Sequence, residues 1–183
     1  MTTKDAIEHS SEARRAAERV ARESYGRLVA FLAARTRDVA GAEDALADAF
    51  VAALGAWPEK GVPANPDAWL LTAARNRQAD AARRRTTRLA GEQHLMLMAD
   101  EIEAAAAAAG DIPDRRLALM FACAHPEIEQ GMRAPLILQT ILGLTAAEIA
   151  GAFLVPPATM GQRLVRAKAR IRDAGIPFEV PAR

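Results

Sequence analysis

Apolar residues recur three and four positions apart along most of this chain, which is the spacing of amphipathic helices rather than of strands. The first such stretch, residues 11–37, predicts one helix or a pair of helices. A second helix is expected after Asp38, which suits a capping position, and it ends at the Trp-Pro pair of residues 57–58. Proline and glycine mark residues 58–66 as a loop, and the next helix is predicted over 67–88.

The periodic pattern then stops in an acidic stretch. Residues 92–114 contain six acidic side chains and no lysine or arginine, with an alanine run at 104–109. We interpret this stretch as a linker that is partly helical through its alanines. Two further helices are predicted at 115–124 and 133–142. The sequence therefore predicts an all-α fold of two small helical domains joined by an acidic linker, with boundaries at 1–90, 91–112 and 113–183.

Residues 144–172 have the pattern of two helices joined by a tight turn. Thr145 and Glu148 form a Thr-x-x-Glu sequence, which predicts a capping box at the start of the first helix. Two prolines at 156–157 end that helix and suit the opening turn of the next one. The second helix carries one apolar stripe, formed by Met160, Leu164, Ala167 and Ile171. This is the form of a helix-turn-helix.

The opposite face of the second helix is polar and basic. Residues 156–172 hold five lysine or arginine side chains and no acidic one. The second helix of such a motif enters the DNA major groove, so Thr159, Gln162 and Arg163 are the candidates to read bases. The whole predicted DNA-binding set is Ala158, Thr159, Gln162, Arg163, Arg166, Lys168 and Arg170, of which the last three are expected to hold phosphates. A solvated basic face is the alternative interpretation.

Composition narrows the class of protein. The chain has 183 residues, 51% of them apolar but only 4% aromatic, and its net charge of +1 does not by itself indicate nucleic acid. The single cysteine excludes an internal disulfide and fits a reducing cytoplasm, where we expect the protein to act. No apolar run is long enough to span a membrane. Charge instead alternates by segment: an acidic helix, a basic helix, the acidic linker and the basic last helix.

Two blocks of sequence resemble a known family. Residues 42–50, with 65–70, 74–76 and Asp80, are similar to region 2 of the sigma-70 family of bacterial transcription initiation factors. Residues 144–168 are similar to region 4 of the same family. The chain thus resembles an extracytoplasmic-function sigma factor over nearly its whole length.

The resemblance implies that the protein binds bacterial RNA polymerase core and promoter DNA. The acidic helix would contact polymerase through Glu43, Asp44 and Asp48, although a solvated face remains the alternative. The loop at 58–66 and the helix after it would bind the −10 element, through Asn65, Trp69, Arg75, Asn76 and Arg83. Trp69 offers a surface for base stacking, and core packing is the alternative for it. The last helix would read the −35 element, and the acidic linker would suit a basic polymerase channel.

Three short segments, at 123–126, 153–156 and 176–181, resemble a subgroup that carries a further C-terminal helical repeat domain. Such a regulatory C-terminal extension, or an anti-sigma factor, is therefore a candidate partner. The glycine that is usual in the turn of a helix-turn-helix is missing, and Leu154 stands near its place.

Other functions are weighed against this interpretation. Cys123 and His125 could suggest zinc, but a structural zinc site needs about four ligands and there is no second cysteine. No metal or cofactor is expected, and the absence of a phosphate loop or nucleophile motif argues against an enzyme. The main alternative is a homodimeric helix-turn-helix transcription regulator that does not associate with core polymerase. A helical adaptor whose basic helices bind an acidic partner is a third possibility.

Overall fold

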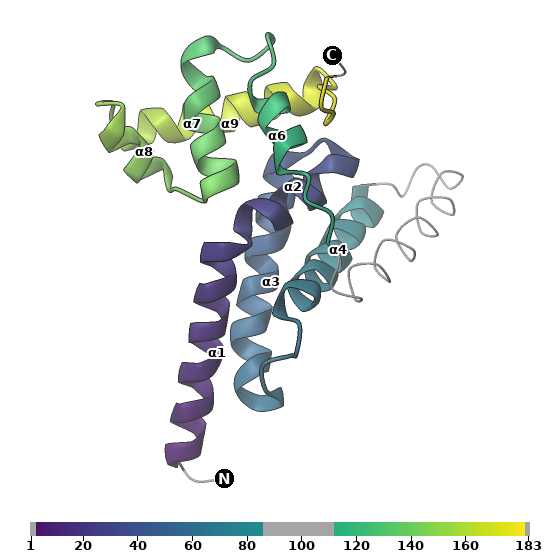
Figure 1. Ribbon diagram of the computed structural model, residues 1–183, viewed down its shortest axis with the longest axis vertical. Helices are drawn as coiled ribbons and strands as arrows, with labels where there is room; N and C mark the ends of the chain where they lie inside the picture. Colours follow the sequence, from purple (N-terminus) through teal and green to yellow (C-terminus); the bar gives the residue numbers. More distant parts are fainter. Residues whose placement is uncertain (1–2, 86–111, 182–183) are drawn as a thin grey trace. The chain divides into compact units, whose positions relative to one another are not determined.

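The computed structural model describes residues 3–85 and 112–181, and within these ranges every regular element is a helix, as Figure 1 shows. The predicted all-α fold class is confirmed. The predicted linker lies outside the described residues, apart from its last residue, Ile112. The described helices are α1 (Thr3–Glu23), α2 (Tyr25–Thr36), α3 (Val39–Lys60), α4 (Pro66–Arg85), α6 (Arg116–Cys123), α7 (Gln130–Leu142), α8 (Ala146–Ala152) and α9 (Pro157–Asp173).

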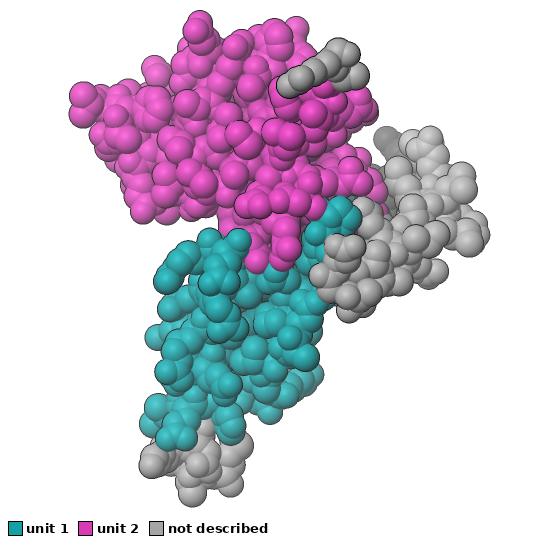
Figure 2. Space-filling view, in the orientation of Figure 1, with its two compact units in different colours: residues 1–23, 44–113 teal, residues 24–43, 114–183 magenta. Residues whose placement is uncertain are grey.

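The chain packs into two compact units, coloured separately in Figure 2. Unit 1 consists of residues 1–23 and 44–113, and unit 2 of residues 24–43 and 114–183. The division does not follow a single cut through the chain, because α2 and the first residues of α3 belong to unit 2. The domain boundaries expected from the sequence remain predictions, since they describe the order of segments and not which segments share a core.

Unit 1 is held together by small apolar side chains of α1, α3 and α4, with one large aromatic group. Its buried residues include Ala13, Ala16, Ala17, Val20, Leu46, Ala49, Ala53, Trp57, Leu70, Leu71 and Ala74. Trp57 is 2% exposed and meets the ring of Trp69 edge to face, with 5.5 Å between centroids. Alanine contributes little buried area per residue, so Trp57 with Leu46, Leu70 and Leu71 provides much of the hydrophobic stabilisation of this unit.

Unit 2 is built around α7, which packs against α2, α6, α8 and α9. The stripe predicted for α9 is confirmed, because all four of its residues are at most 8% exposed. Ile149 and Ala150 of α8 are also buried, which lets the two helices of the motif approach closely. After α9, Gly175 takes a left-handed conformation with φ of 61°, and the Ile176 N–H donates to the Ile171 carbonyl. A glycine in the left-handed conformation ends many helices in this way.

Several boundaries differ from those expected. Helix α3 passes through Pro58 and ends at Lys60, because proline removes only one donor and the turn closes at Gly61, whose N–H donates to the Trp57 carbonyl. Helix α7 begins at Gln130 and not at residue 133. The helical spacing after Leu70 and Ala74 allows Ala81 to face the same core, yet Ala81 is exposed. The cap at Asp38 is confirmed, since its carboxylate accepts the Gly41 N–H at 3.0 Å.

None of the described helices combines the length and apolar character needed to cross a membrane.

Candidate nucleic-acid interface

Helices α8 and α9 form the predicted helix-turn-helix, and its first helix is capped as expected. The Thr145 hydroxyl accepts the Glu148 N–H at 3.2 Å, and the Glu148 carboxylate accepts the Thr145 N–H at 2.7 Å. The Thr145 hydroxyl also donates to the Glu148 carboxylate at 2.7 Å. The bonds from the Thr145 N–H and the Thr145 hydroxyl hold the pKa of the Glu148 carboxyl below its usual value, because both favour the ionised form. The predicted capping box is therefore confirmed, and it fixes where α8 begins.

The turn between the two helices contains a strained residue. Leu154 has φ of 53°, a left-handed conformation that a leucine rarely adopts, and its side chain is 93% exposed. The chain reverses here through a bond from the Val155 N–H to the Ala150 carbonyl at 3.1 Å. Leu154 thus occupies the conformation that glycine usually provides, at a cost of about 1–2 kcal/mol. The turn closes without its glycine, and Pro157 then opens α9 at the first helical position.

The polar face of α9 is open to solvent along most of its length. Ala158, Gln162, Arg163, Arg166 and Arg170 are exposed, and Thr159 is half-buried. These residues lie opposite the buried stripe, so they share one surface. The N-terminal half of α9 thereby presents an amide, a guanidinium and a hydroxyl side by side, which are groups that form hydrogen bonds with base edges in the major groove.

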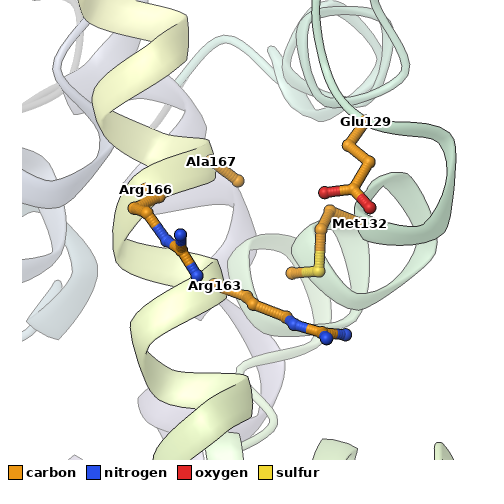
Figure 3. A pocket seen from close by; sticks show the side chains of 5 residues that line it. All are labelled: Glu129, Met132, Arg163, Arg166 and Ala167. Carbon is orange, nitrogen blue, oxygen red and sulfur yellow. The ribbon is translucent and has the colours of Figure 1, made fainter.

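A hollow of about 170 Å³ lies beside this surface within unit 2. Figure 3 shows Arg163 and Arg166 projecting from α9, with Glu129 and Met132 across from them. Glu129 stands at the N-terminal cap position of α7. Its place across the hollow from two arginines was not predicted, because a residue outside any periodic pattern gives no local signal of neighbours so distant in sequence.

The last two predicted phosphate ligands are placed differently from the first. Lys168 is 9% exposed, and its Nζ donates to the Glu43 carboxylate at 2.6 Å. Arg170 is exposed and forms an ion pair with Glu127. In this structure Lys168 therefore does not lie on the open face with Arg163 and Arg166. The sequence contains a partial indication of this burial, because residue 168 is four positions after Leu164 and three before Ile171. This spacing places Lys168 at the edge of the buried stripe.

The residues predicted to bind the −10 element lie in unit 1, at the residue before α4 and along α4 itself. The Asn65 side-chain oxygen accepts the Ala68 N–H at 3.0 Å, so Asn65 caps α4. Trp69 is half-buried against Trp57, so part of its ring remains accessible. Arg75 is half-buried, whereas Asn76 and Arg83 are exposed, and Arg83 forms a surface ion pair with Asp80 at 3.2 Å.

The three acidic residues predicted to bind polymerase do not share one environment. Asp44 and Asp48 are exposed on α3 in unit 1, one turn apart. Glu43 belongs to unit 2, and its side chain is only 14% exposed in the ion pair with Lys168. The exposed stripe of α3 continues through Val51, which is 71% exposed, to Leu54, which is 47% exposed. These two apolar residues extend the acidic face and were not predicted as part of a site.

The region considered for zinc consists of a buried thiol and a nearby histidine. Cys123 is buried, with its Sγ 3.7 Å from the Thr140 hydroxyl, and burial raises the pKa of this thiol to about 12. His125 accepts the Glu127 N–H at 3.2 Å through Nδ1. Among the residues for which the structure gives positions, no group of three metal-ligating side chains comes together.

Comparison with known proteins gives matches to two parts of one family. Residues 20–88 match sigma-70 region 2, and residues 118–171 match sigma-70 region 4. An uncharacterized protein of Rhizobium meliloti (strain 1021) is 42% identical over 144 residues, which cover 76% of this chain and 34% of that protein. The match thus spans about a third of the relative's length. No solved structure matches.

The two sigma-70 matches occur in the order that the sequence blocks suggested, and they account for both helical regions. Region 4 includes the whole helix-turn-helix up to Ile171, and region 2 includes the acidic face of α3 and the tryptophan pair. Both regions belong to non-enzymatic transcription initiation factors. The two matches together cover about two thirds of the chain, which therefore belongs to the sigma-70 family and is similar to its extracytoplasmic-function members.

Proposed function

We propose that this protein binds core RNA polymerase and directs it to promoters by recognising a −35 element with α9 and a −10 element with α4 and the loop before it. The open polar face of α9 is the main support for this proposal. Gln162 and Arg163 are exposed there, on the second helix of a helix-turn-helix whose first helix begins with a capping box. The chemistry of transcription belongs to polymerase, so no catalytic residue is proposed here. As a polymerase partner the protein would act in the bacterial cytoplasm.

At the −35 element, α9 would lie in the major groove with its N-terminal half against the bases. Arginine forms a bidentate pair with guanine and glutamine with adenine, and each such pair discriminates by roughly 1–3 kcal/mol. Arg166 and Arg170 would hold phosphates, which sets the position of the helix without reading sequence. Glu129 lies across the hollow from Arg163 and Arg166, so its negative charge would disfavour phosphate at that spot and favour a base-edge donor.

At the −10 element, the loop after α3 and the exposed side of α4 would hold single-stranded DNA. The accessible part of Trp69 offers a stacking surface, and such stacking is worth roughly 1–3 kcal/mol per base. Its edge-to-face contact with Trp57 would hold the ring in place before DNA arrives. Asn76 and Arg83 are exposed on the same helix and would contact bases or backbone.

Polymerase would dock on the exposed stripe of α3. Asp44 and Asp48 supply negative charge, and Val51 and Leu54 supply apolar area that water otherwise covers. A basic helical surface with an apolar centre complements this arrangement, because interfaces combine a buried apolar core with a charged rim. Regulation by an anti-sigma factor or by a C-terminal helical extension is proposed as well.

The DNA proposal is tested by replacing arginines on one helix. Arg163→Ala should lose preference for the −35 sequence, with a discrimination loss of about 1–3 kcal/mol, because it removes a base-reading side chain. Arg172→Ala is the matched control, since Arg172 is exposed near the end of α9 and pairs with Asp173 at 3.0 Å. Promoter selection is measured by transcription from templates that differ only at the −35 element. Equal selectivity in both variants would refute the base-reading role.

The polymerase proposal is tested by charge reversal on α3. Asp44→Lys with Asp48→Lys should weaken binding to core polymerase, because both carboxylates lie on the proposed docking stripe. Glu59→Lys is the control, as Glu59 is exposed near the end of the same helix. Affinity for core polymerase is measured with a fluorescently labelled chain. If the paired reversal and the control bind equally well, polymerase docks elsewhere. Symmetric dimer binding to DNA without polymerase would instead favour the homodimeric regulator.

A further inference from the structure

The loop between α6 and α7 is held in one shape by hydrogen bonds from its own residues and from α7. The His125 ring accepts the Glu127 N–H at 3.2 Å through Nδ1, and the Ile128 N–H donates to the His125 carbonyl at 2.9 Å. The Arg133 side chain donates to the Ile128 carbonyl at 3.0 Å, and the Ile128 side chain is buried. Residues 125–129, which we term the acidic loop, therefore hold their two glutamates in defined places.

The two glutamates of the acidic loop face a row of arginines on α9. Arg163, Arg166 and Arg170 follow one another at spacings of three and four residues, so they lie along one side of the helix. Glu127 forms an ion pair with Arg170. Glu129 lies across the hollow of about 170 Å³ from Arg163 and Arg166, and Figure 3 shows its carboxylate turned toward that hollow. The acidic loop thus brings negative charge to the whole row.

The start of α7 does not explain why position 129 is a glutamate. Glu129 stands at the N-terminal cap, yet its side chain accepts no capping hydrogen bond, and serine, threonine, aspartate or asparagine is the usual residue there. Its backbone carbonyl accepts the Met132 N–H at 2.8 Å, which any residue can do. Among the residues that the structure describes, neither Arg163 nor Arg166 has an ion-pair partner. Both arginines therefore remain available to DNA, with a carboxylate close by.

A carboxylate near an arginine changes which DNA group that arginine binds best. Each DNA phosphate is negatively charged, and a fixed carboxylate nearby repels it. The N7 and O6 atoms of guanine are neutral acceptors, so the same carboxylate repels them far less. A carboxylate in this place therefore lowers the affinity for DNA of any sequence more than it lowers the affinity for a matching site. Specificity arises from such a difference between two affinities.

We propose, on the basis of the function proposed above, that Glu129 is a positioning residue for −35 recognition and acts through Arg163. Its charge weakens phosphate contacts of Arg163, so the guanidinium pairs with a guanine edge instead. Glu127 has a different part, because Arg170 exchanges the Glu127 carboxylate for a phosphate whatever the DNA sequence. Glu129 thus sets specificity, whereas Glu127 sets only overall affinity.

The experiment begins by finding the DNA sequence that the protein prefers. The full chain, alone and assembled with sigma-free core polymerase, selects from a pool of duplexes that are randomised over the −35 region. The enriched duplex is then compared with a shuffled duplex of the same composition, by fluorescence anisotropy over a series of KCl concentrations. The specificity ratio is the dissociation constant of the shuffled duplex divided by that of the enriched duplex.

Glu129→Gln should lower the specificity ratio about two- to fivefold, the range of one exposed charge pair, mainly by tightening binding to the shuffled duplex. For that duplex, the slope of log affinity against log salt should become steeper by about 0.9, because Arg163 gains one phosphate. Glu127→Gln should tighten both duplexes alike and leave the ratio unchanged. Glu179→Gln is the control for net charge, since Glu179 is exposed in the same unit beyond α9, and it should change neither the ratio nor the slope.

The same change in an Arg163→Ala chain separates a positioning role from a structural one. In that background Glu129→Gln should alter neither the ratio nor the slope, because Glu129 acts through Arg163. A structural role predicts a lower melting temperature and equal weakening of both duplexes instead.

The proposal is overturned if Glu129→Gln behaves like the Glu179→Gln control, or if it changes the ratio equally with and without Arg163. In either case an enriched sequence from the parent chain leaves the proposed function standing. If the parent chain enriches no sequence, alone or with polymerase, α9 reads no −35 element, and the proposed function fails together with the role of Glu129.

Discussion

Gly26 offers a direct test of how closely α2 and α7 approach in unit 2. A β-carbon at this position would lie 2.1 Å from the carbonyl oxygen of Ile141 and 2.9 Å from its carbonyl carbon. These are backbone atoms, so no side chain can rotate away, and the helices would have to separate by roughly 1 Å to restore ordinary contact. Gly26→Ala should therefore destabilise unit 2 although alanine is the better helix former.

The magnitude follows from two opposing effects. Overpacking of a tight contact costs about 1–3 kcal/mol, and the backbone clash places this site at the upper end of that range. The gain in helix propensity returns about 1 kcal/mol. The net loss is about 2 kcal/mol, which lowers the melting temperature by about 4–8 °C for a chain of this length.

Gly151→Ala is the matched control, because Gly151 lies inside α8 with no atom within 4 Å of an added β-carbon. Only the propensity gain applies there, so the free energy of unfolding should rise by about 0.5–1 kcal/mol. Both variants are measured by urea and thermal unfolding followed by far-ultraviolet circular dichroism. The reasoning is refuted if Gly26→Ala is as stable as the parent chain or gains stability as the control does.

Three further predictions concern unit 2. Thr145→Ala removes the capping box and should cost about 1 kcal/mol in urea unfolding; an unchanged midpoint would contradict the role of the cap. Leu154→Gly relieves about 1–2 kcal/mol of left-handed strain and loses about 0.5–1 kcal/mol of backbone entropy, so a small net gain in stability is expected; a net loss would mean that the exposed leucine makes a stabilising contact. Cys123 should resist thiol reagents in the folded chain and react once unfolded. Because its folded pKa of about 12 exceeds the ordinary thiol value of 9.0, the folded state holds the proton more tightly, and stability should fall as pH rises from 9 toward 12. A pH-independent stability across that window would argue against a buried thiol.

The helix-turn-helix could be predicted in detail because its signals are local. The capping box needs only Thr145 and Glu148, three residues apart, and the buried stripe of α9 needs only the helical period. Local hydrogen bonding and periodicity decide both features before any tertiary contact forms. The strain at Leu154 was foreshadowed by the missing glycine, since a turn of this kind needs a left-handed residue whatever its type.

The placement of α2 could not be predicted from the sequence in the same way. Its buried residues include Leu28, Val29, Phe31 and Leu32. These apolar side chains indicate that the helix is enclosed by other elements, but they do not identify those elements. Periodicity identifies the apolar face of a helix, and it does not identify the partner of that face. The pairing of Glu43 with Lys168 was hidden for the same reason, because each charge also fitted a surface role on its own helix. The predicted −10, −35 and polymerase contacts remain predictions.

The measurement that bears most directly on this account is transcription in vitro by sigma-free core polymerase with and without the protein, on fragments that carry candidate promoters. The account predicts that the protein binds core polymerase and produces transcripts of defined start. It also predicts that polymerase given the chain with both Asp44→Lys and Asp48→Lys produces few transcripts, while polymerase given the Glu59→Lys control stays active. Absence of core binding, or transcripts that do not depend on the added protein, would contradict the central claim.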